Sequence, residues 1–274
     1  MPVPVEPSDI IDTSRPSAAR VYDCAIGGKD HFEVDRELTR RINDRVPAAS
    51  SLAVANRRFL IRAVRFLARE AGIDQYLDCG SGLPAAENTH QVAQRIAPEA
   101  QVVYVDNDPA VAAHSRALLA DNDRSHFLDA DIHRPAEVLG ARLVREKLDF
   151  TRPLALLHVG TLHHYDEERG GKSAADLVGE YAAALPSGSF VAFSHFLDPE
   201  DADGEPARLV EAMLRAGLGT GFFRTRDEIE AMLAGLELLE PGLVIADDWW
   251  PDGPRRTPLP PISRCISAAV ARTP

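Results

Sequence analysis

Long apolar runs are missing from this sequence of 274 residues. Every apolar run is far shorter than the roughly 20 residues that a membrane-spanning helix needs, so no membrane span is expected. The first ten residues, MPVPVEPSDI, carry two acidic side chains, no basic cluster and no apolar core. Because this composition is unlike that of a secretory signal, we expect a cytoplasmic protein.

Cysteine and positive charge are also scarce. The three cysteines, Cys24, Cys79 and Cys265, are widely spaced and odd in number, which argues against a disulfide scaffold and a structural zinc site. With 30 basic and 42 acidic residues, the net charge is −12. Binding of nucleic acid by counterion release needs a basic face, so no nucleic-acid partner is expected. Whether the chain is a monomer or a homodimer stays open.

What the sequence does contain, after residue 74, is a regular alternation of short apolar runs and helical segments. A run rich in β-branched residues, such as Gln101–Asp106, predicts a buried strand. Seven strands are predicted, at Gln75–Cys79, Gln101–Asp106, Ser125–Leu128, Leu154–Val159, Phe190–His195, Leu236–Ile245 and Ile262–Val270. Helices between strands favour an α/β fold with a doubly wound, mostly parallel sheet, and the last two strands are expected to form an antiparallel pair.

The first 74 residues predict helices only. One of them, Ser50–Ala71, places apolar side chains near helical spacing and is followed by Gly72, which favours a helix end. No stretch of the chain resembles a linker between domains. We therefore expect one sheet-based domain over residues 75–274 with a helical N-terminal extension over residues 1–74.

The residues that follow the first strand are the first candidates for a binding site, because ligands of such sheets lie beyond the carboxyl ends of the strands. Gly80 and Gly82 allow a ligand to approach the backbone closely. A Gly-rich turn also suits dinucleotides, but the carboxylate of Asp78 would repel a pyrophosphate and attract an ammonium group. S-adenosylmethionine (SAM) carries such an ammonium group. The alternative is that Asp78 only stabilises the turn.

The residues after the next three strands extend this pattern to a nucleoside. Asp106 ends the second strand, where an acid accepts both ribose hydroxyls, and Asn107 follows it. After the third strand, Asp131 is expected to accept from the adenine amine and Ile132 to pack on the ring. A solvated loop carboxylate is an equally good interpretation of Asp131. Gly160, after the fourth strand, is placed where a flat ligand would pass close to the backbone.

These residues belong to longer segments that resemble a known family. The segments Asp12–Glu37, Leu77–Pro109 and Arg224–Val244 are similar to an actinobacterial family that was long a domain of unknown function and is now called S-adenosyl methyltransferase. The resemblance implies SAM as cofactor and the Rossmann-like class I methyltransferase fold. It implies no particular substrate. Family members usually have Leu-His-Phe after the fourth strand, where this chain has Leu162-His163-His164.

The resemblance also suggests a role for the N-terminal extension, because such extensions often cover the cofactor in class I methyltransferases. In that case Lys29, in the segment YDCAIGGKDHF with Gly28, would meet the SAM carboxylate, and Tyr22 would stack on the cofactor or hydrogen-bond to it. The alternative is an N-terminal helix that docks only for packing.

Histidines offer the acid–base chemistry. His158, His163 and His195 lie at or beyond strand ends, and His163 is our first candidate for a catalytic base because it follows the Gly160 turn. A purely structural role is the alternative for each of them, because buried histidines commonly just hydrogen-bond. The neighbouring acids, Asp166 among them, lack recognisable ligand spacing with these histidines, so no metal site is expected.

The sequence is compatible with three functions. The first is a SAM-dependent methyltransferase that acts on an unidentified small molecule at oxygen or nitrogen. The second is a SAM-binding protein without transferase activity, a sensor or structural partner, which a sealed cavity beside the cofactor would favour. The third is a nicotinamide-dependent oxidoreductase, which Asp78 disfavours.

Overall fold

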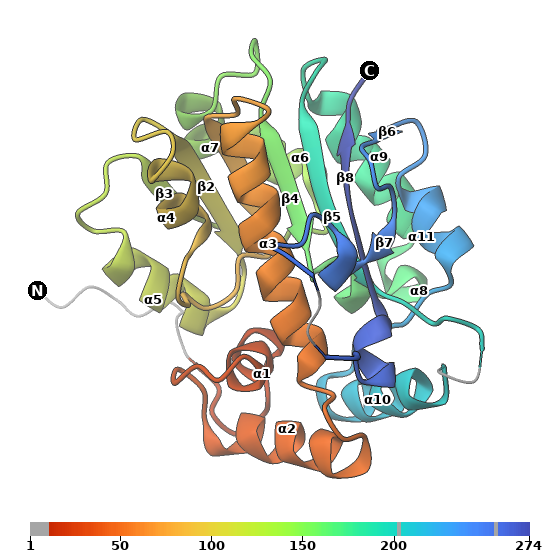
Figure 1. The fold of residues 1–274 in the computed structure, drawn as a ribbon. Helices are drawn as coiled ribbons and strands as arrows, with labels where there is room; N and C mark the ends of the chain where they lie inside the picture. Colours follow the sequence, from red (N-terminus) through yellow and green to blue (C-terminus); the bar gives the residue numbers. More distant parts are fainter. Residues whose placement is uncertain (1–10, 202–203, 255–256) are drawn as a thin grey trace, which may run out of the picture.

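A single mixed sheet forms the centre of the molecule in the computed structural model, which describes residues 11–201, 204–254 and 257–274 (Figure 1). Its strand order is β3-β2-β1-β4-β5-β8-β6, and β7 also pairs with β8. β1 to β5 are parallel to one another, and β8 is antiparallel to β5. The strands are β1 (Gln75–Cys79), β2 (Gln101–Asp106), β3 (Ser125–Asp129), β4 (Ala155–Val159), β5 (Phe190–Phe196), β6 (Glu237–Leu238), β7 (Val244–Ile245) and β8 (Ile266–Arg272).

The sheet has eight strands and not the predicted seven, because the segment expected as one strand is divided. β6 and β7 both pair with β8, but a turn closed by a 2.7 Å bond from the Gly242 amide to the Leu239 carbonyl separates them. Pro241 in this turn has no amide hydrogen to donate to a ladder, and Gly242 has a φ of +81°. The mostly parallel α/β sheet and its antiparallel end are confirmed.

Helices cover both faces of the sheet, as Figure 1 shows for α3 on the near face. The helices are α1 (Ala18–Ala25), α2 (Glu33–Arg45), α3 (Ser51–Arg69), α4 (Thr89–Gln94), α5 (Pro109–Leu118), α6 (Pro135–Gly140), α7 (Arg142–Lys147), α8 (Glu167–Gly170), α9 (Ala174–Ala184), α10 (Gly204–Leu218) and α11 (Arg226–Met232), with 3₁₀ turns η2 (Leu162–His164), η3 (Ala246–Asp248) and η4 (Pro261–Arg264). None of the described helices is long and apolar enough to cross a membrane.

Alternating side chains of each strand point into two separate hydrophobic clusters. Tyr76 of β1 and Leu157 of β4 are fully buried in the cluster that contains α3. Leu77 and Leu156, their neighbours along the strands, are fully buried in the cluster that contains α9. Both faces of the central strands are therefore covered, which explains why their sequences are almost continuously apolar.

The N-terminal helices have two different positions. α3 lies on the sheet, and its Phe59, Ala63 and Leu67 share a cluster with β1, so this helix is part of the layer that covers the sheet. α1 and α2 lie beyond one end of the sheet (Figure 1), and a buried ion pair of 2.9 Å between Arg20 and Asp35 joins them. The part of residues 11–74 that lies over the strand ends is thus α1 and α2.

The helix expected after the first glycine turn is much shorter than the predicted segment of about Ala85–Ala97, an offset typical of sequence-based boundaries. α4 begins at Thr89, because Asn88 and Gln91 form a capping box at this point. Residues 83–88 are consequently free to form a loop. The carbonyls of Ala86 and Glu87 in this loop accept hydrogen bonds from Arg57 of α3.

We expect Phe59→Ala to lower the free energy of unfolding by about 3–5 kcal/mol, because a large cavity would form in the cluster that holds α3 on the sheet. Phe59 is fully buried and packs edge-on against Trp249, with ring centroids 5.4 Å apart. Urea unfolding would measure the loss. The control is Leu118→Ala at a side chain that is 42% exposed, where a change within about 0.5 kcal/mol is expected. Equal effects of the two substitutions would contradict the packing described for α3.

Candidate functional site

The loop after β1 is shaped by its two predicted glycines. Gly80 and Gly82 have φ values of +74° and +64°, which residues other than glycine rarely adopt. A Cβ atom at Gly80 would lie 2.4 Å from Cγ2 of Thr161. The amide of Gly80 donates to the Val105 carbonyl at 2.7 Å, so the loop turns back over the end of β2. This conformation brings the loop backbone to the edge of a pocket.

Asp78 is a buried carboxylate at the end of β1, with 6% of its surface exposed. Its Oδ2 accepts a 2.6 Å hydrogen bond from the Thr89 hydroxyl, at the start of α4. Burial raises the pKa of Asp78 to about 6, and the hydrogen bond from Thr89 and the positive charge of Arg57 act in the opposite direction. A carboxylate with so little solvation gains strongly from a cationic ligand.

Asp106, at the end of β2, is tied to the same loop. Its Oδ2 accepts from the Gly82 amide at 2.9 Å, and its Oδ1 accepts from the Asp108 amide at 3.0 Å. Burial again raises the carboxyl pKa, to about 6. A carboxylate has about four acceptor positions, more than these backbone bonds occupy, so Asp106 can still accept from a ligand hydroxyl group.

Most of the predicted cofactor residues line a single pocket of about 420 Å³, which we call the cofactor pocket. It lies at the carboxyl ends of β1 to β4, as expected for a sheet of this topology. The predicted residues that line it are Tyr22, Asp78, Gly80, Gly82, Asp106, Asn107, Asp131, Ile132 and Gly160. Its size is that of a pocket for a small molecule or cofactor.

The residues after β3 and β4 differ in how free they are to bind. Oδ1 of Asp131 accepts from the His133 amide at 2.9 Å, so this carboxylate already serves its own loop. Gly160 has a φ of +73°, and a Cβ atom there would lie 2.5 Å from Nδ2 of Asn56. The close contact at Gly160 is therefore with Asn56 of α3, a reason for glycine that the sequence does not reveal.

Two predicted residues, Gly28 and Lys29, do not line the cofactor pocket. They border a separate pocket with Pro84 and His114. A Cβ atom at Gly28 would lie 1.9 Å from the Asp23 carboxylate, so this glycine is needed for the turn itself. Lys29 is exposed on the same turn. Lys29 therefore lines this separate pocket and not the pocket that contains Asp78.

The cation that does line the cofactor pocket is Arg57, which the sequence analysis did not identify. Arg57 is half-buried on α3, and its Nη2 donates to the carbonyls of Ala86 and Glu87 at 3.0 and 3.1 Å. Its Nε is buried without a hydrogen-bond partner among the described residues. Because α3 carries several arginines, only its packing on the sheet shows which of them faces the pocket.

Tyr22 reaches the cofactor pocket from α1. Its hydroxyl donates to the Ala53 carbonyl at 3.2 Å and accepts from Nδ2 of Asn56 at 3.1 Å. Both of its polar functions are thus used within the protein. What Tyr22 offers to a ligand is mainly the ring, a surface for stacking.

His163, the predicted base, lies outside the cofactor pocket and lines a neighbouring pocket. Its ring stacks on Phe196 with centroids 3.7 Å apart. Burial is the main reason that the pKa of His163 lies well below its ordinary value, and the pKa values of His158 and His195 fall to about 3 and about 4 for the same reason. His164 lines both pockets, and burial lowers its pKa to about 4. All four imidazoles are neutral near pH 7.

Known proteins share the sequence and the fold of this chain. Residues 4–274 match the family model described as S-adenosyl methyltransferase. A candidate methyltransferase from Thermobifida fusca YX is 41% identical, with 96% of each chain covered and a TM-score of 0.90. A DUF574 family protein from Streptomyces avermitilis MA-4680 is 40% identical, with 97% of this chain and 100% of that one covered and a TM-score of 0.89. No curated protein matches the sequence.

A more distant structure shares the fold alone. It is an O-methyltransferase family protein from Burkholderia thailandensis, 13% identical, with a TM-score of 0.51 over 82% of this chain and 59% of that one. The family match covers nearly the whole chain and agrees with the sheet topology. This chain therefore belongs to the S-adenosyl methyltransferase family, and it is a SAM-dependent methyltransferase with the class I Rossmann-like fold.

Proposed function

We propose that the cofactor pocket binds SAM and that the methyl group passes to the oxygen or nitrogen of a small molecule. The observation that carries the proposal is the pair of carboxylates, buried Asp78 and part-buried Asp106, beside one cation, Arg57, in the same pocket. When bound, SAM supplies an electrophilic methyl group on a positively charged sulfur. The protein's residues bind and orient the two reactants, and alignment is the main requirement of such a transfer.

The polar groups of the cofactor each have a candidate partner in the pocket. Asp78 would accept from the ammonium group, and Asp106 would accept from both ribose hydroxyls. Arg57, with its unpaired Nε, would hold the carboxylate in place of Lys29. Asp131 would accept from the adenine amine, with Ile132 against the ring. Nicotinamide dinucleotides fit less well, because their pyrophosphate would lie near Asp78.

The other pocket residues have supporting roles in this proposal. Gly80, Gly82 and Gly160 would let the ligand pass close to the backbone, and Asn107 would contact the adenosine part. Tyr22 would cover the cofactor from α1, so α1 and α2 serve as a lid. None of the three cysteines, all within the described residues, forms a disulfide, which supports a cytoplasmic location.

Binding of the demethylated product S-adenosylhomocysteine (SAH) tests the proposed site. We expect Asp78→Asn and Asp106→Asn each to weaken SAM and SAH binding about tenfold or more. A tenfold loss of affinity corresponds to about 1.4 kcal/mol of binding free energy. Isothermal titration calorimetry would measure the affinities, with NAD as the competing ligand. The control is Asp121→Asn at an exposed acid outside the pocket. Unchanged affinity in both pocket variants, or tighter binding of NAD than of SAH, would refute the assignment.

Arg57 and Lys29 offer a matched test of which cation meets the cofactor carboxylate. We expect Arg57→Gln to weaken SAH binding about tenfold and Lys29→Gln to change it less than about twofold. Adenosine, which has no carboxylate, should bind both variants as it binds the unchanged protein. A larger effect of Lys29→Gln than of Arg57→Gln would place the carboxylate elsewhere.

The affinity for SAH should depend on pH near pH 6. The pKa of Asp78 is about 6 in the free protein, and the ammonium group binds the ionised carboxylate, so binding must expel a proton at lower pH. We expect the affinity to fall about tenfold from pH 7 to pH 5 and to change little above pH 7. Calorimetry at several pH values would measure how the SAH affinity depends on pH, and this dependence should be weaker in Asp78→Asn. An affinity that rises as the pH falls would contradict this role of Asp78.

A further inference from the structure

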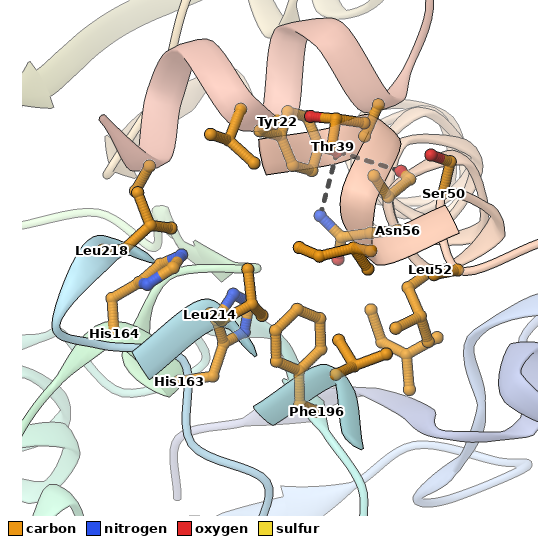
Figure 2. A pocket seen from close by; sticks show the side chains of 18 of the residues that line it. Tyr22, Thr39, Ser50, Leu52, Asn56, His163, His164, Phe196, Leu214 and Leu218 are labelled. Atoms are coloured by element: carbon orange, nitrogen blue, oxygen red, sulfur yellow. Dashed lines mark hydrogen bonds between the residues drawn. The ribbon is translucent and has the colours of Figure 1, made fainter. Parts of the chain in front are cut away.

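A second, almost entirely apolar pocket adjoins the cofactor pocket, and we call it the acceptor pocket. Figure 2 shows His163, His164 and Phe196 on one side of it and Tyr22, Thr39 and Asn56 on the other. Apolar side chains such as Leu52, Leu214 and Leu218 complete the lining. The pocket thus lies between the N-terminal helices, the end of β5 and α10.

The two pockets share part of their walls. Ala18, Tyr22, Asn56 and His164 line both of them. Tyr22 and Asn56 are joined by a hydrogen bond of 3.1 Å, so this shared wall has a defined structure. A molecule in the acceptor pocket would therefore lie directly beside a molecule in the cofactor pocket.

The acceptor pocket contains no Asp, Glu, Lys or Arg side chain among its described lining residues. Its two histidines are neutral near pH 7, as argued above. A charged group that entered this pocket would lose its hydration and find no opposite charge, which is costly. With a volume of about 80 Å³, against about 420 Å³ for the cofactor pocket, the space favours a compact molecule.

Most polar side chains of the acceptor pocket already have partners. Oδ1 of Asn56 accepts from the Ser194 hydroxyl, and Nδ2 of Asn43 donates to the Ser50 hydroxyl at 2.8 Å. Nδ1 of His164 lies 2.9 Å from the Thr220 hydroxyl. These bonds hold the lining in place and leave few polar atoms for a ligand.

His163 is the exception. Its Nδ1 is buried and has no hydrogen-bond partner among the described residues, and only 4% of the residue is exposed. Its ring cannot easily turn away, because it stacks on Phe196. An unpaired buried nitrogen costs free energy, which a ligand hydroxyl that donates to it would recover.

We propose that the acceptor pocket binds the methyl acceptor, an uncharged apolar molecule about the size of one substituted ring, whose single hydroxyl group donates to Nδ1 of His163. This proposal rests on the proposed function, because it needs SAM in the cofactor pocket. In the transfer, the hydroxyl oxygen forms a bond to the methyl carbon. The carbon–sulfur bond breaks and its electron pair goes to sulfur, while the hydroxyl proton, which becomes strongly acidic as the oxygen forms its new bond, leaves along the hydrogen bond to Nδ1 of His163 and passes to water.

Three phenols of similar shape test the charge selectivity. 4-Ethylphenol is neutral, 4-hydroxyphenylacetate carries a carboxylate and tyramine carries an ammonium group. We expect 4-ethylphenol to bind the SAH-loaded protein at least about tenfold more tightly than either charged probe, as measured by calorimetry or ligand-observed NMR. With SAM in place of SAH, mass spectrometry should detect the methyl ether of 4-ethylphenol. Absence of 4-ethylphenol binding at millimolar concentration, or equal binding of all three probes, would overturn the proposal.

Variants test the location. Leu218→Trp, at the edge of the acceptor pocket, should weaken 4-ethylphenol binding about tenfold, and Met213→Trp, on the same helix but outside the lining, should not. His163→Phe keeps a flat ring without the acceptor nitrogen. The unchanged protein should prefer 4-ethylphenol to ethylbenzene, and His163→Phe should lose most of this preference. A preference that survives in His163→Phe, or equal effects of the two tryptophan variants, would refute the location.

The binding of SAH separates this proposal from the proposed function. All three variants should bind SAH within about twofold of the unchanged protein, because none of these residues lines the cofactor pocket. If the unchanged protein fails to bind SAH, the proposed function fails. If it binds SAH but prefers a charged probe, only the acceptor proposal fails.

Discussion

The packing of α3 on the sheet is the contact on which both pockets depend. Phe59 and Leu67 are fully buried against the strands, and this fixes the rotation of the helix about its axis. One turn earlier, the same rotation directs Asn56 towards Gly160 and the wall between the pockets, and it places Arg57 in the cofactor pocket. A loss of this packing would therefore alter stability and ligand binding together. The glycine at position 160 shows how close the contact is, because a side chain there would collide with Asn56.

The two pockets differ in charge, and the difference suits two different ligands. The cofactor pocket holds Asp78 and Asp106, whose pKa values burial raises to about 6, together with Arg57. An ammonium group would have an acidic partner in this pocket and a carboxylate group would have Arg57. The acceptor pocket, in contrast, is lined by apolar groups and neutral histidines. In the proposed arrangement, this division would keep charged molecules other than the cofactor away from the shared wall.

The sequence predicted the fold class well because its signal is local. Buried parallel strands need apolar β-branched runs, and the polar or glycine residues after them are visible by position alone. The errors have local causes as well. Pro241 and Gly242 divide the predicted strand at Leu236–Ile245, and the capping box at Asn88 shortens the helix that follows the glycine loop.

By itself, the sequence determined the order of strands and helices along the chain and the residues that follow each strand, since chain position alone specifies them. The tertiary structure alone decided which cation lines the pocket of Asp78. Arg57 is one of several arginines on an amphipathic helix, whereas Lys29 stands out in its segment but lines only a separate pocket. It also decided that His163 lies in a second pocket with an unpaired nitrogen. Such facts depend on contacts between segments far apart in the chain, and no local pattern encodes them.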